Sequence, residues 1–203
     1  MDNTRRYILA ITGASGAPFA LALLRRMILE PAVSQVVLLS SPTGRRCLMD
    51  ETGARLEDLA ARAKGPGGAD RVLLLDENDL GAEFSSGSCL HGGMAVVPCS
   101  AGTLGRIASG TSDNLIVRAA DVCLKERRPL VLCLRETPLG RVHMENMLRA
   151  HDAGAVVMPL SPTFYHSPRT IDDLCDAFAT RVMDLLGLHQ EDGRRWKPAS
   201  AGR

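Results

Sequence analysis

The chain has 203 residues, enough for one domain with a single buried core, and its 24 lysines and arginines balance 23 acidic residues to leave a formal net charge of +1. Because the positive and negative charges nearly cancel, the chain has no overall electrostatic field to attract nucleic acid or an anionic membrane. Any anion must therefore be recognised locally. No apolar run reaches the roughly 18 residues of a membrane span, and the polar start MDNTRR leads straight into an apolar strand. We expect a cytoplasmic, single-domain protein (1–203) with a polar tail from about residue 188.

The six cysteines and five histidines lack the spacings of metal sites and disulfide frameworks. No CxxC pair occurs, four cysteines lie inside apolar segments, and the histidines form no HExxH or other closely paired set. Single cysteines in apolar surroundings are typical of small core residues in a reducing compartment. We therefore expect neither disulfides nor a bound metal.

Short apolar runs alternate with segments of helical periodicity, the pattern of a parallel sheet with crossover helices. The expected strands are residues 7–12, 35–39, 71–75, 94–97, 130–134 and 155–158. The expected helices are residues 17–29, 43–51, 103–109, 113–126, 143–153 and 171–187. The segment 53–71 ends in a Gly/Pro cluster and is interpreted as a surface excursion.

A turn of small residues, Thr12 to Pro18, joins the first strand to the first helix. The unpaired N–H groups and dipole of a helix start favour a phosphate. The turn is not GxGxxG, and Ser40-Ser41 stands after the second strand where a ribose-binding acid would be needed, so a mononucleotide such as FMN is favoured over a dinucleotide. Ser15 lacks the GxSxG spacing of a hydrolase nucleophile, and a helix cap that also contacts a ligand is favoured.

Two more small-residue turns flank the fourth strand. Ser85-Ser86-Gly87-Ser88 precedes it, and Pro98 to Thr103 follows it. Such clusters are ordinary turn material when they occur singly. Three of them near strand ends favour an anionic cofactor site.

Charged residues surround the fifth strand. Arg135 and Glu136 close it, where ligands of open parallel sheets bind, so this pair suits an anion and an acid/base group, with a solvated loop as the alternative. The preceding run KERR at 125–128 is by itself typical of a solvated loop. Arg181, at the edge of the apolar stripe of the last helix, either reaches water or is held partly buried to meet a phosphate.

The chain resembles the UbiX/Pad-type flavin prenyltransferases, formerly described as aromatic acid decarboxylases, from about residue 6 to 196. The segments that carry the resemblance are GASGA at 13–17, the Ser41 position, SSGS at 85–88, PCSxxTL at 98–104, TSDNLIVRAADVCLKERRPLVLCLRETPL at 111–139 and FYHSP at 164–168. The resemblance implies an α/β, flavodoxin-like or Rossmann-like three-layer fold. It also implies transfer of a dimethylallyl group from dimethylallyl phosphate to N5 and C6 of reduced FMN, yielding the prenylated FMN of UbiD-type decarboxylases, and assembly into dodecamers with sites at subunit junctions.

The resemblance implies roles for individual residues. Those implied to hold FMN are Gly13, Ala14, Ser15, Ser41, Ser100, Ala101, Gly102, Thr103 and Arg135. Those implied to surround dimethylallyl phosphate are Ser86, Gly87, Lys125, Tyr165, Arg181 and Trp196. The polar groups implied to serve the chemistry are Ser15, Glu51, Lys125 and Glu136. The chain departs from some relatives at Ala101-Gly102, where a bulky residue and a lysine often stand, and at His91 after SSGSCL.

Two other functions stay open at this point. An FMN-dependent cysteine decarboxylase of the phosphopantothenoylcysteine type has a related fold, but RETPLGRVHMENML occupies the place of its PxMNxxMW-like motif. A flavodoxin-like electron carrier or a non-enzymatic FMN-binding subunit of a decarboxylase complex would leave Lys125, Glu136, Tyr165 and Arg181 without a role.

Overall fold

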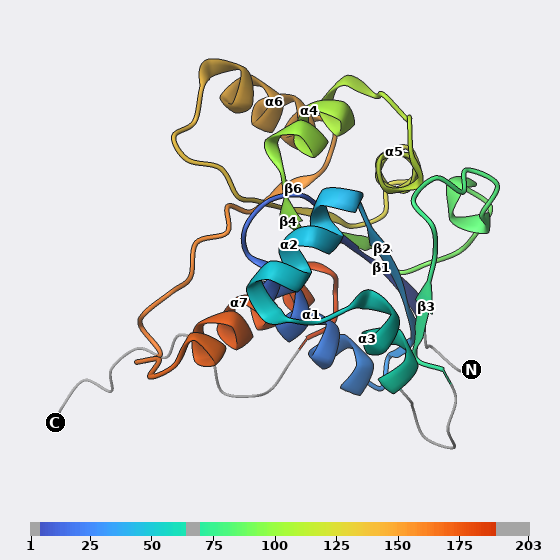
Figure 1. The fold of residues 1–203 in the computed structure, drawn as a ribbon. Coiled ribbons are helices and arrows are strands. Elements are labelled where there is room, and N and C mark those ends of the chain that lie inside the picture. Colours follow the sequence, from blue (N-terminus) through green and yellow to red (C-terminus); the bar gives the residue numbers. More distant parts are fainter. Residues whose placement is uncertain (1–4, 64–69, 190–203) are drawn as a thin grey trace, which may run out of the picture.

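The computed structural model describes residues 5–63 and 70–189, and within them six strands form one parallel sheet (Figure 1). The strands are β1 (Arg5–Ile11), β2 (Val33–Ser40), β3 (Val72–Leu74), β4 (Met94–Cys99), β5 (Leu130–Leu134) and β6 (Val156–Val157). They lie in the order β3-β2-β1-β4-β5-β6, and every pairing is parallel. This is the order of a Rossmann-type doubly wound sheet, whose direction of winding switches between β1 and β4.

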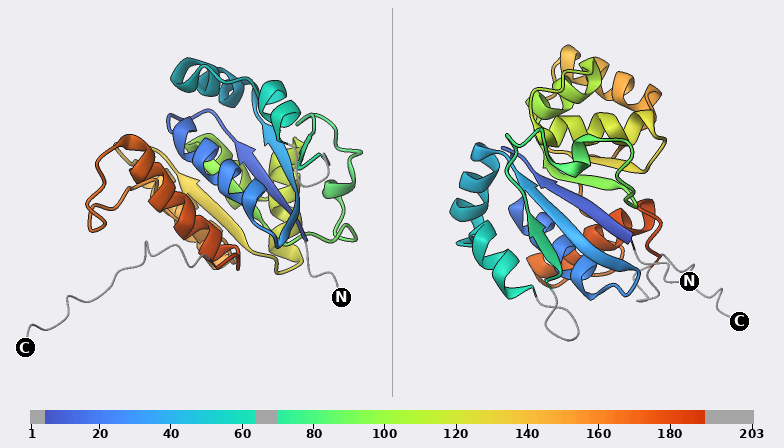
Figure 2. Two further views of the ribbon diagram at one scale, coloured as in Figure 1. Left: turned by 90° about the horizontal axis from the view of Figure 1, so that it is seen from below. Right: turned by 90° about the vertical axis from the view of Figure 1, so that its right-hand side faces the viewer.

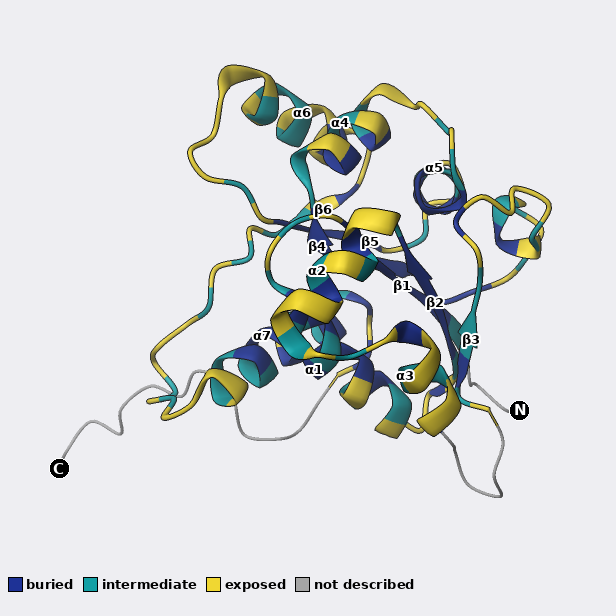
Figure 3. Cartoon of the chain, in the orientation of Figure 1, coloured by how far each residue is buried: buried dark blue, intermediate teal, exposed yellow. Residues whose placement is uncertain are grey.

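Helices cover both faces of the sheet, which confirms the expected three-layer α/β fold (Figure 2). One face carries α1 (Ala17–Leu29), α2 (Pro42–Thr52), α3 (Leu56–Arg62) and α7 (Ile171–Leu185). The other carries α4 (Ala101–Ser109), α5 (Leu115–Lys125) and α6 (Arg141–Asp152). Successive strand residues point to opposite faces, so Leu9 and Ile11 join the first core while Ile8 and Ala10 join the second. The central strands β1, β2, β4 and β5 are mostly buried, as Figure 3 shows, whereas the edge strands β3 and β6 are only partly covered.

The strand and helix predictions are confirmed to within a few residues, with one exception. Helix α3 lies inside segment 53–71, which we expected to be a surface excursion. Its seven residues are too few for a clear periodic signal, yet Leu56 is 2% exposed and packs into the core beside α1. A short 3-10 helix, Glu83–Ser85, also escaped prediction. All six cysteines are free thiols, and no helix of the described ranges is long and apolar enough to span a membrane.

Candidate functional site

The turns after β1 and β4 are joined by a single hydroxyl. Thr12 Oγ1 donates to the carbonyl of Pro98 at 2.8 Å and accepts from the backbone N–H of Ser100, also at 2.8 Å. The Thr12 side chain is 1% exposed, so these bonds form in a dry environment where they are strong. They hold the two turns side by side at the switch point, where open α/β sheets bind their ligands.

The start of α1 is occupied by a carboxylate from α2. Glu51 Oε2 accepts from the N–H groups of Gly16 at 2.9 Å and Ala17 at 2.8 Å. These N–H groups, which we expected to favour a phosphate, are therefore occupied by Glu51 in this structure. Ser15 is not the helix cap either, because the cap position belongs to Gly16, whose φ of 126° suits glycine, and no side-chain hydroxyl bonds there. The Ser15 side chain is left exposed beside the crevice.

The start of α4 offers open donors. Ser100 caps this helix, its Oγ accepting from Thr103 N–H at 3.2 Å and donating to Thr103 Oγ1 at 3.0 Å. The N–H groups of Ala101 and Gly102 precede the first helical bond and have no acceptor within the described ranges. A Cβ placed on Gly102 would meet no atom within 4 Å, so this helix start faces open space that an anion can enter.

Ser41 makes the equivalent cap on α2. Its Oγ accepts from Gly44 N–H at 3.0 Å, and the helix continues with Pro42 in its first turn. Gly44 lies against the end of β1, because a Cβ there would come within 2.3 Å of the Ile11 carbonyl. A Cβ on Gly13 would likewise collide with Thr43 at 2.4 Å. The start of α2 therefore packs directly on the β1 turn and belongs to the same crevice.

Arg135 and Glu136 follow β5 at this edge, as predicted. Arg135 N–H donates to the Cys99 carbonyl at 3.0 Å, which holds the pair beside the β4 turn. The exposed Arg135 guanidinium makes no hydrogen bond or ion pair within the described part of the chain. Glu136 Oε1 accepts from Thr137 N–H at 3.0 Å, which orients the carboxylate and leaves its second oxygen available. The arrangement suits an anionic ligand next to an acid/base group.

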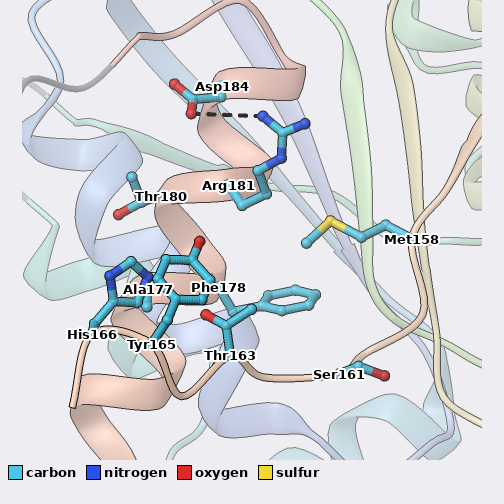
Figure 4. A pocket seen from close by; sticks show the side chains of 10 residues that line it. All are labelled: Met158, Ser161, Thr163, Tyr165, His166, Ala177, Phe178, Thr180, Arg181 and Asp184. Atoms are coloured by element: carbon cyan, nitrogen blue, oxygen red, sulfur yellow. Dashed lines mark ion pairs between the residues drawn. The ribbon is translucent and has the colours of Figure 1, made fainter. Parts of the chain in front are cut away.

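Tyr165 and Arg181 line one cavity of about 370 Å³ between α7 and the loop after β6 (Figure 4). Arg181 is not held partly buried: its side chain is 62% exposed, and its Nη1 lies 3.9 Å from Asp184 Oδ2. The guanidinium therefore reaches water in this structure, and any contact with a ligand phosphate would be made from an exposed position. The loop begins beside the β1 turn, because a Cβ on Gly16 would lie 3.1 Å from Leu160 Cδ1.

Ser86, Gly87 and Lys125 lie at the other edge of the sheet. Their loop precedes β4, and α5 ends at Lys125 just before β5. Lys125 Nζ pairs with Glu126 Oε1, a hydrogen bond that holds the pKa of Glu126 below its ordinary value. The five residues of β5, about 17 Å in length, separate this group from Glu136. Of the three small-residue turns, two therefore converge within a single chain, and the third lies at the opposite edge.

Two arginines for which the sequence predicted no binding role fix the loop at residues 85–89. Arg118 Nε donates to the Ser85 carbonyl at 2.9 Å. Arg128 donates to the carbonyls of Gly87 at 2.6 Å and Cys89 at 2.7 Å. The half-buried Arg128 thus departs from the solvated loop expected for KERR. The charged run before the buried strand β5 was the only sequence signal for Arg128. The carbonyl groups that it binds lie too far away in the sequence to be predicted from a local pattern.

Comparison with known proteins places these features in a family. A family model described as Flavoprotein matches residues 1–189. A protein of Deinococcus radiodurans named Flavin prenyltransferase UbiX is 45% identical over 196 residues, covering 97% of this chain and 95% of that protein. A Pseudomonas aeruginosa protein of the same name is 40% identical over 207 residues, covering 97% of this chain and 96% of its own.

A solved structure supports the same grouping. The crystal structure of AnUbiX in complex with FMN and dimethylallyl pyrophosphate superposes with a TM-score of 0.84 at 42% identity, covering 96% of this chain and 98% of that one. Within the described ranges, no group of three His, Cys, Asp or Glu side chains could hold a metal. Trp196, the last residue implied by the resemblance, lies outside the described residues. With near-complete coverage at these identities, the chain belongs to the flavoprotein family and, within it, to the flavin prenyltransferases.

Proposed function

We propose that this chain transfers a dimethylallyl group from dimethylallyl phosphate to N5 and C6 of reduced FMN. The observation that carries the proposal is the switch-point crevice, where the β1 turn, the β4 turn and the Arg135-Glu136 pair meet. That crevice suits a phosphorylated mononucleotide, and it places an acid/base group within the same site. The product would serve a UbiD-type decarboxylase, and the six free cysteines are consistent with work in the reducing cytoplasm.

The residues of the crevice fit FMN. Bound there, reduced FMN supplies the nucleophilic ring positions. The open N–H groups of Ala101 and Gly102 and the unpaired Arg135 guanidinium provide a positive environment for its phosphate. The turn residues and hydroxyls that would complete the binding surface are Gly13, Ala14, Ser15, Ser41, Ser100 and Thr103.

Chemistry at the other substrate needs charge stabilisation, because the phosphate that leaves dimethylallyl phosphate carries a concentrated negative charge. Arg181 can supply bidentate donors to that phosphate, and the Tyr165 hydroxyl adds a neutral donor from the same cavity. Glu136 and the exposed Ser15 hydroxyl are the groups we assign to moving protons. Glu51 acts on the start of α1, where it fixes the backbone that positions Ser15.

The remaining donor-binding residues require a second copy of the chain. Ser86, Gly87 and Lys125 are separated from Glu136 by the length of strand β5. A single chain therefore cannot bring these residues to one substrate. A solved relative at 40% identity, from Escherichia coli O157:H7, is described as a dodecameric FMN-dependent UbiX-like decarboxylase. We propose that this chain also forms a homo-oligomer, a dodecamer by analogy, in which one copy's Lys125 group completes the crevice of another. Trp196 is proposed to help close that site.

One assay tests the activity. The protein is incubated anaerobically with reduced FMN and dimethylallyl phosphate, the flavin is extracted, and its mass is measured. The proposal requires a flavin heavier by one dimethylallyl unit. Unchanged FMN from a protein that binds both substrates would contradict it.

A second assay tests the shared site. Lys125→Gln and Glu136→Gln should each be nearly inactive alone. Mixed oligomers assembled from both variants should recover about one quarter of the activity, because random pairing restores both residues at that share of the sites. Failure to recover activity in verified mixed oligomers would place both residues within one chain's site.

A further inference from the structure

A second basic cavity lies at the amino edge of the sheet, away from the crevice. Its volume is about 590 Å³. It is assembled from the starts of neighbouring strands and the loops before them, and its lining residues are Arg5, Arg6, Ser34, Leu90, His91 and Arg128. Because β2, β1, β4 and β5 are adjacent in the sheet, residues far apart in the sequence meet there.

His91 has no hydrogen-bond partner in this cavity. The residue is only 7% exposed, and neither ring nitrogen is bonded. Burial lowers the pKa of His91, and the Gly93 backbone approaches the ring closely enough to raise it again in part, but neither ring nitrogen reaches hydrogen-bond geometry with that backbone. A neutral imidazole carries one donor and one acceptor, so both are left unmatched at a cost of about 1–3 kcal/mol each. A buried polar ring of this kind calls for a ligand or an ordered water.

The charges around His91 are mostly positive and only partly neutralised. Arg6 is matched by Glu83, with Nη1–Oε1 at 2.5 Å and Nη2–Oε2 at 3.0 Å. Arg128 bonds only to backbone carbonyls, which carry no full charge. Arg5 is exposed, with no side-chain partner within the described residues. The excess of two positive charges therefore favours an anion.

We propose that this cavity is a second anion site, which binds inorganic phosphate or a small phosphate monoester through Arg5, Arg128 and His91. The ligand would be bound by the two unneutralised guanidinium groups, and the His91 ring would donate to a phosphate oxygen. Uptake of one proton by His91 would accompany binding, because the anion stabilises imidazolium against the neighbouring arginines. None of these residues belongs to the crevice, so the site does not depend on the prenyl-transfer proposal.

The site is connected to the loop that carries Ser86 and Gly87. Arg128 reaches into the cavity and also donates to the Gly87 carbonyl. A phosphate bound to Arg128 would compete with the Gly87 and Cys89 carbonyls for the hydrogen-bond donors of the same guanidinium group. Occupancy of the cavity would therefore alter the geometry of a segment that we assign to the donor phosphate.

The test follows the His91 ring by NMR while inorganic phosphate is added to the full-length, FMN-loaded protein. The His91 signal is assigned by its loss in His91→Gln, a change that removes no hydrogen bond of the structure. We expect the signal to move and saturate, and the pKa of His91 to rise. Potassium chloride at matched ionic strength should leave the signal in place. Dimethylallyl phosphate in a parallel titration distinguishes a monoester ligand from free phosphate.

Matched arginine variants locate the binding energy. Arg5→Ala should weaken the phosphate response at His91 by about tenfold, as expected for one lost charged contact. Arg149→Ala, an exposed arginine of α6, should leave the response unchanged. A His91 signal that ignores phosphate, that responds equally to chloride, or that keeps its full response in Arg5→Ala would overturn the assignment.

Discussion

The two edges of the sheet are built in different ways. At the carboxyl edge, turns are joined by the protein's own small hydroxyls and by one carboxylate: Thr12 links two turns, and Glu51 binds the start of α1. At the amino edge, arginine side chains hold a loop by its carbonyls, and a buried histidine is left without partners. At the carboxyl edge, internal hydrogen bonds therefore fix the backbone of the turns and leave the side chains of Arg135 and Ser15 exposed for a ligand. At the amino edge, arginines fix the loop at residues 85–89, but their positive charge is only partly neutralised by acidic residues.

This difference teaches where a second copy of the chain is needed. The carboxyl edge lacks the cation that we assign to the leaving group, apart from the exposed Arg181. The amino edge has cations but no group suited to hold a flavin. Under the assignments proposed above, neither edge alone forms a complete prenyl-transfer site, and each edge has the groups that the other lacks. The following predictions test that division.

The largest effect is expected at the carboxyl edge. Glu136→Gln should lower turnover by between about 100-fold and 10,000-fold, as expected for loss of a general acid/base, while FMN affinity stays nearly unchanged. Arg135→Ala should instead weaken FMN binding through loss of a charge-assisted contact. Flavin affinity by fluorescence and turnover by product mass separate the two. Equal loss of flavin in both variants would mean that Glu136 is structural.

His91 at the amino edge should contribute to the loss of stability in acid. Burial, followed by the charge of Arg128, lowers the pKa of His91 from 6.5 to about 4. The unfolded chain therefore binds the extra proton first, so stability falls as the pH drops from about 6.5 to about 4, by roughly 3 kcal/mol in total. Arg6, Glu83 and Cys89 also face this region.

Urea unfolding across this pH range, in phosphate-free buffer, measures the effect. His91→Gln cannot bind the proton, so its loss of stability over the same range should be smaller than that of the parent protein. The carboxylates of the chain should contribute equally to the two proteins, so their effect cancels in the comparison. Parallel curves for the two proteins would show that His91 does not titrate in this range.

Arg181 tests whether the cavity at α7 serves the donor phosphate. Arg181→Leu should keep the fold and the flavin yet raise the KM for dimethylallyl phosphate by about tenfold or more, since a charged contact of roughly 1.5–3 kcal/mol is lost. Tyr165→Phe should raise KM less, having lost one neutral donor. Arg149→Leu on α6 is the matched control. A flavin-loaded Arg181→Leu protein with parental KM and kcat would leave Arg181 as a surface residue that only reaches water.

The smallest effect concerns the carboxylate at the start of α1. Glu51→Ala should lower the free energy of unfolding by about 1 kcal/mol, because two N–H groups lose their acceptor. Asp50→Ala is the control: its exposed pair with Arg46, at 3.6 Å, should contribute less than about 0.5 kcal/mol. Thermal unfolding of the two variants provides the comparison. Equal stability would remove the capping role from Glu51.

The sequence predicts the layers of this molecule better than its contacts. Strands β1, β2, β4 and β5 are long apolar runs, and the period of α7 is clear, so these elements could be located from local pattern. The Arg135-Glu136 pair could be placed because it directly follows a strand. Helix α3 escaped because seven residues provide barely two turns.

Contacts between distant segments left no local trace. Glu51 lies 34 residues from Ala17, and nothing near either residue indicates that they meet. Arg128 and Gly87 are 41 residues apart. The separation of Lys125 from Glu136 needed the strand order, because residues only 11 positions apart can occupy opposite edges when a strand runs between them. Local sequence patterns therefore locate helices and strands, whereas the edge of the sheet at which a residue lies depends on the strand order.

The bond between Glu51 and the start of α1 also sets a condition on ligands. Any anion that is to use the Gly16 and Ala17 N–H groups must first expel the chain's own carboxylate, so its binding there is an exchange of one negative group for another. Such an exchange preserves the local charge. Neutral ligands gain nothing from this replacement. While Glu51 accepts these two bonds, the start of α1 is closed to any other acceptor.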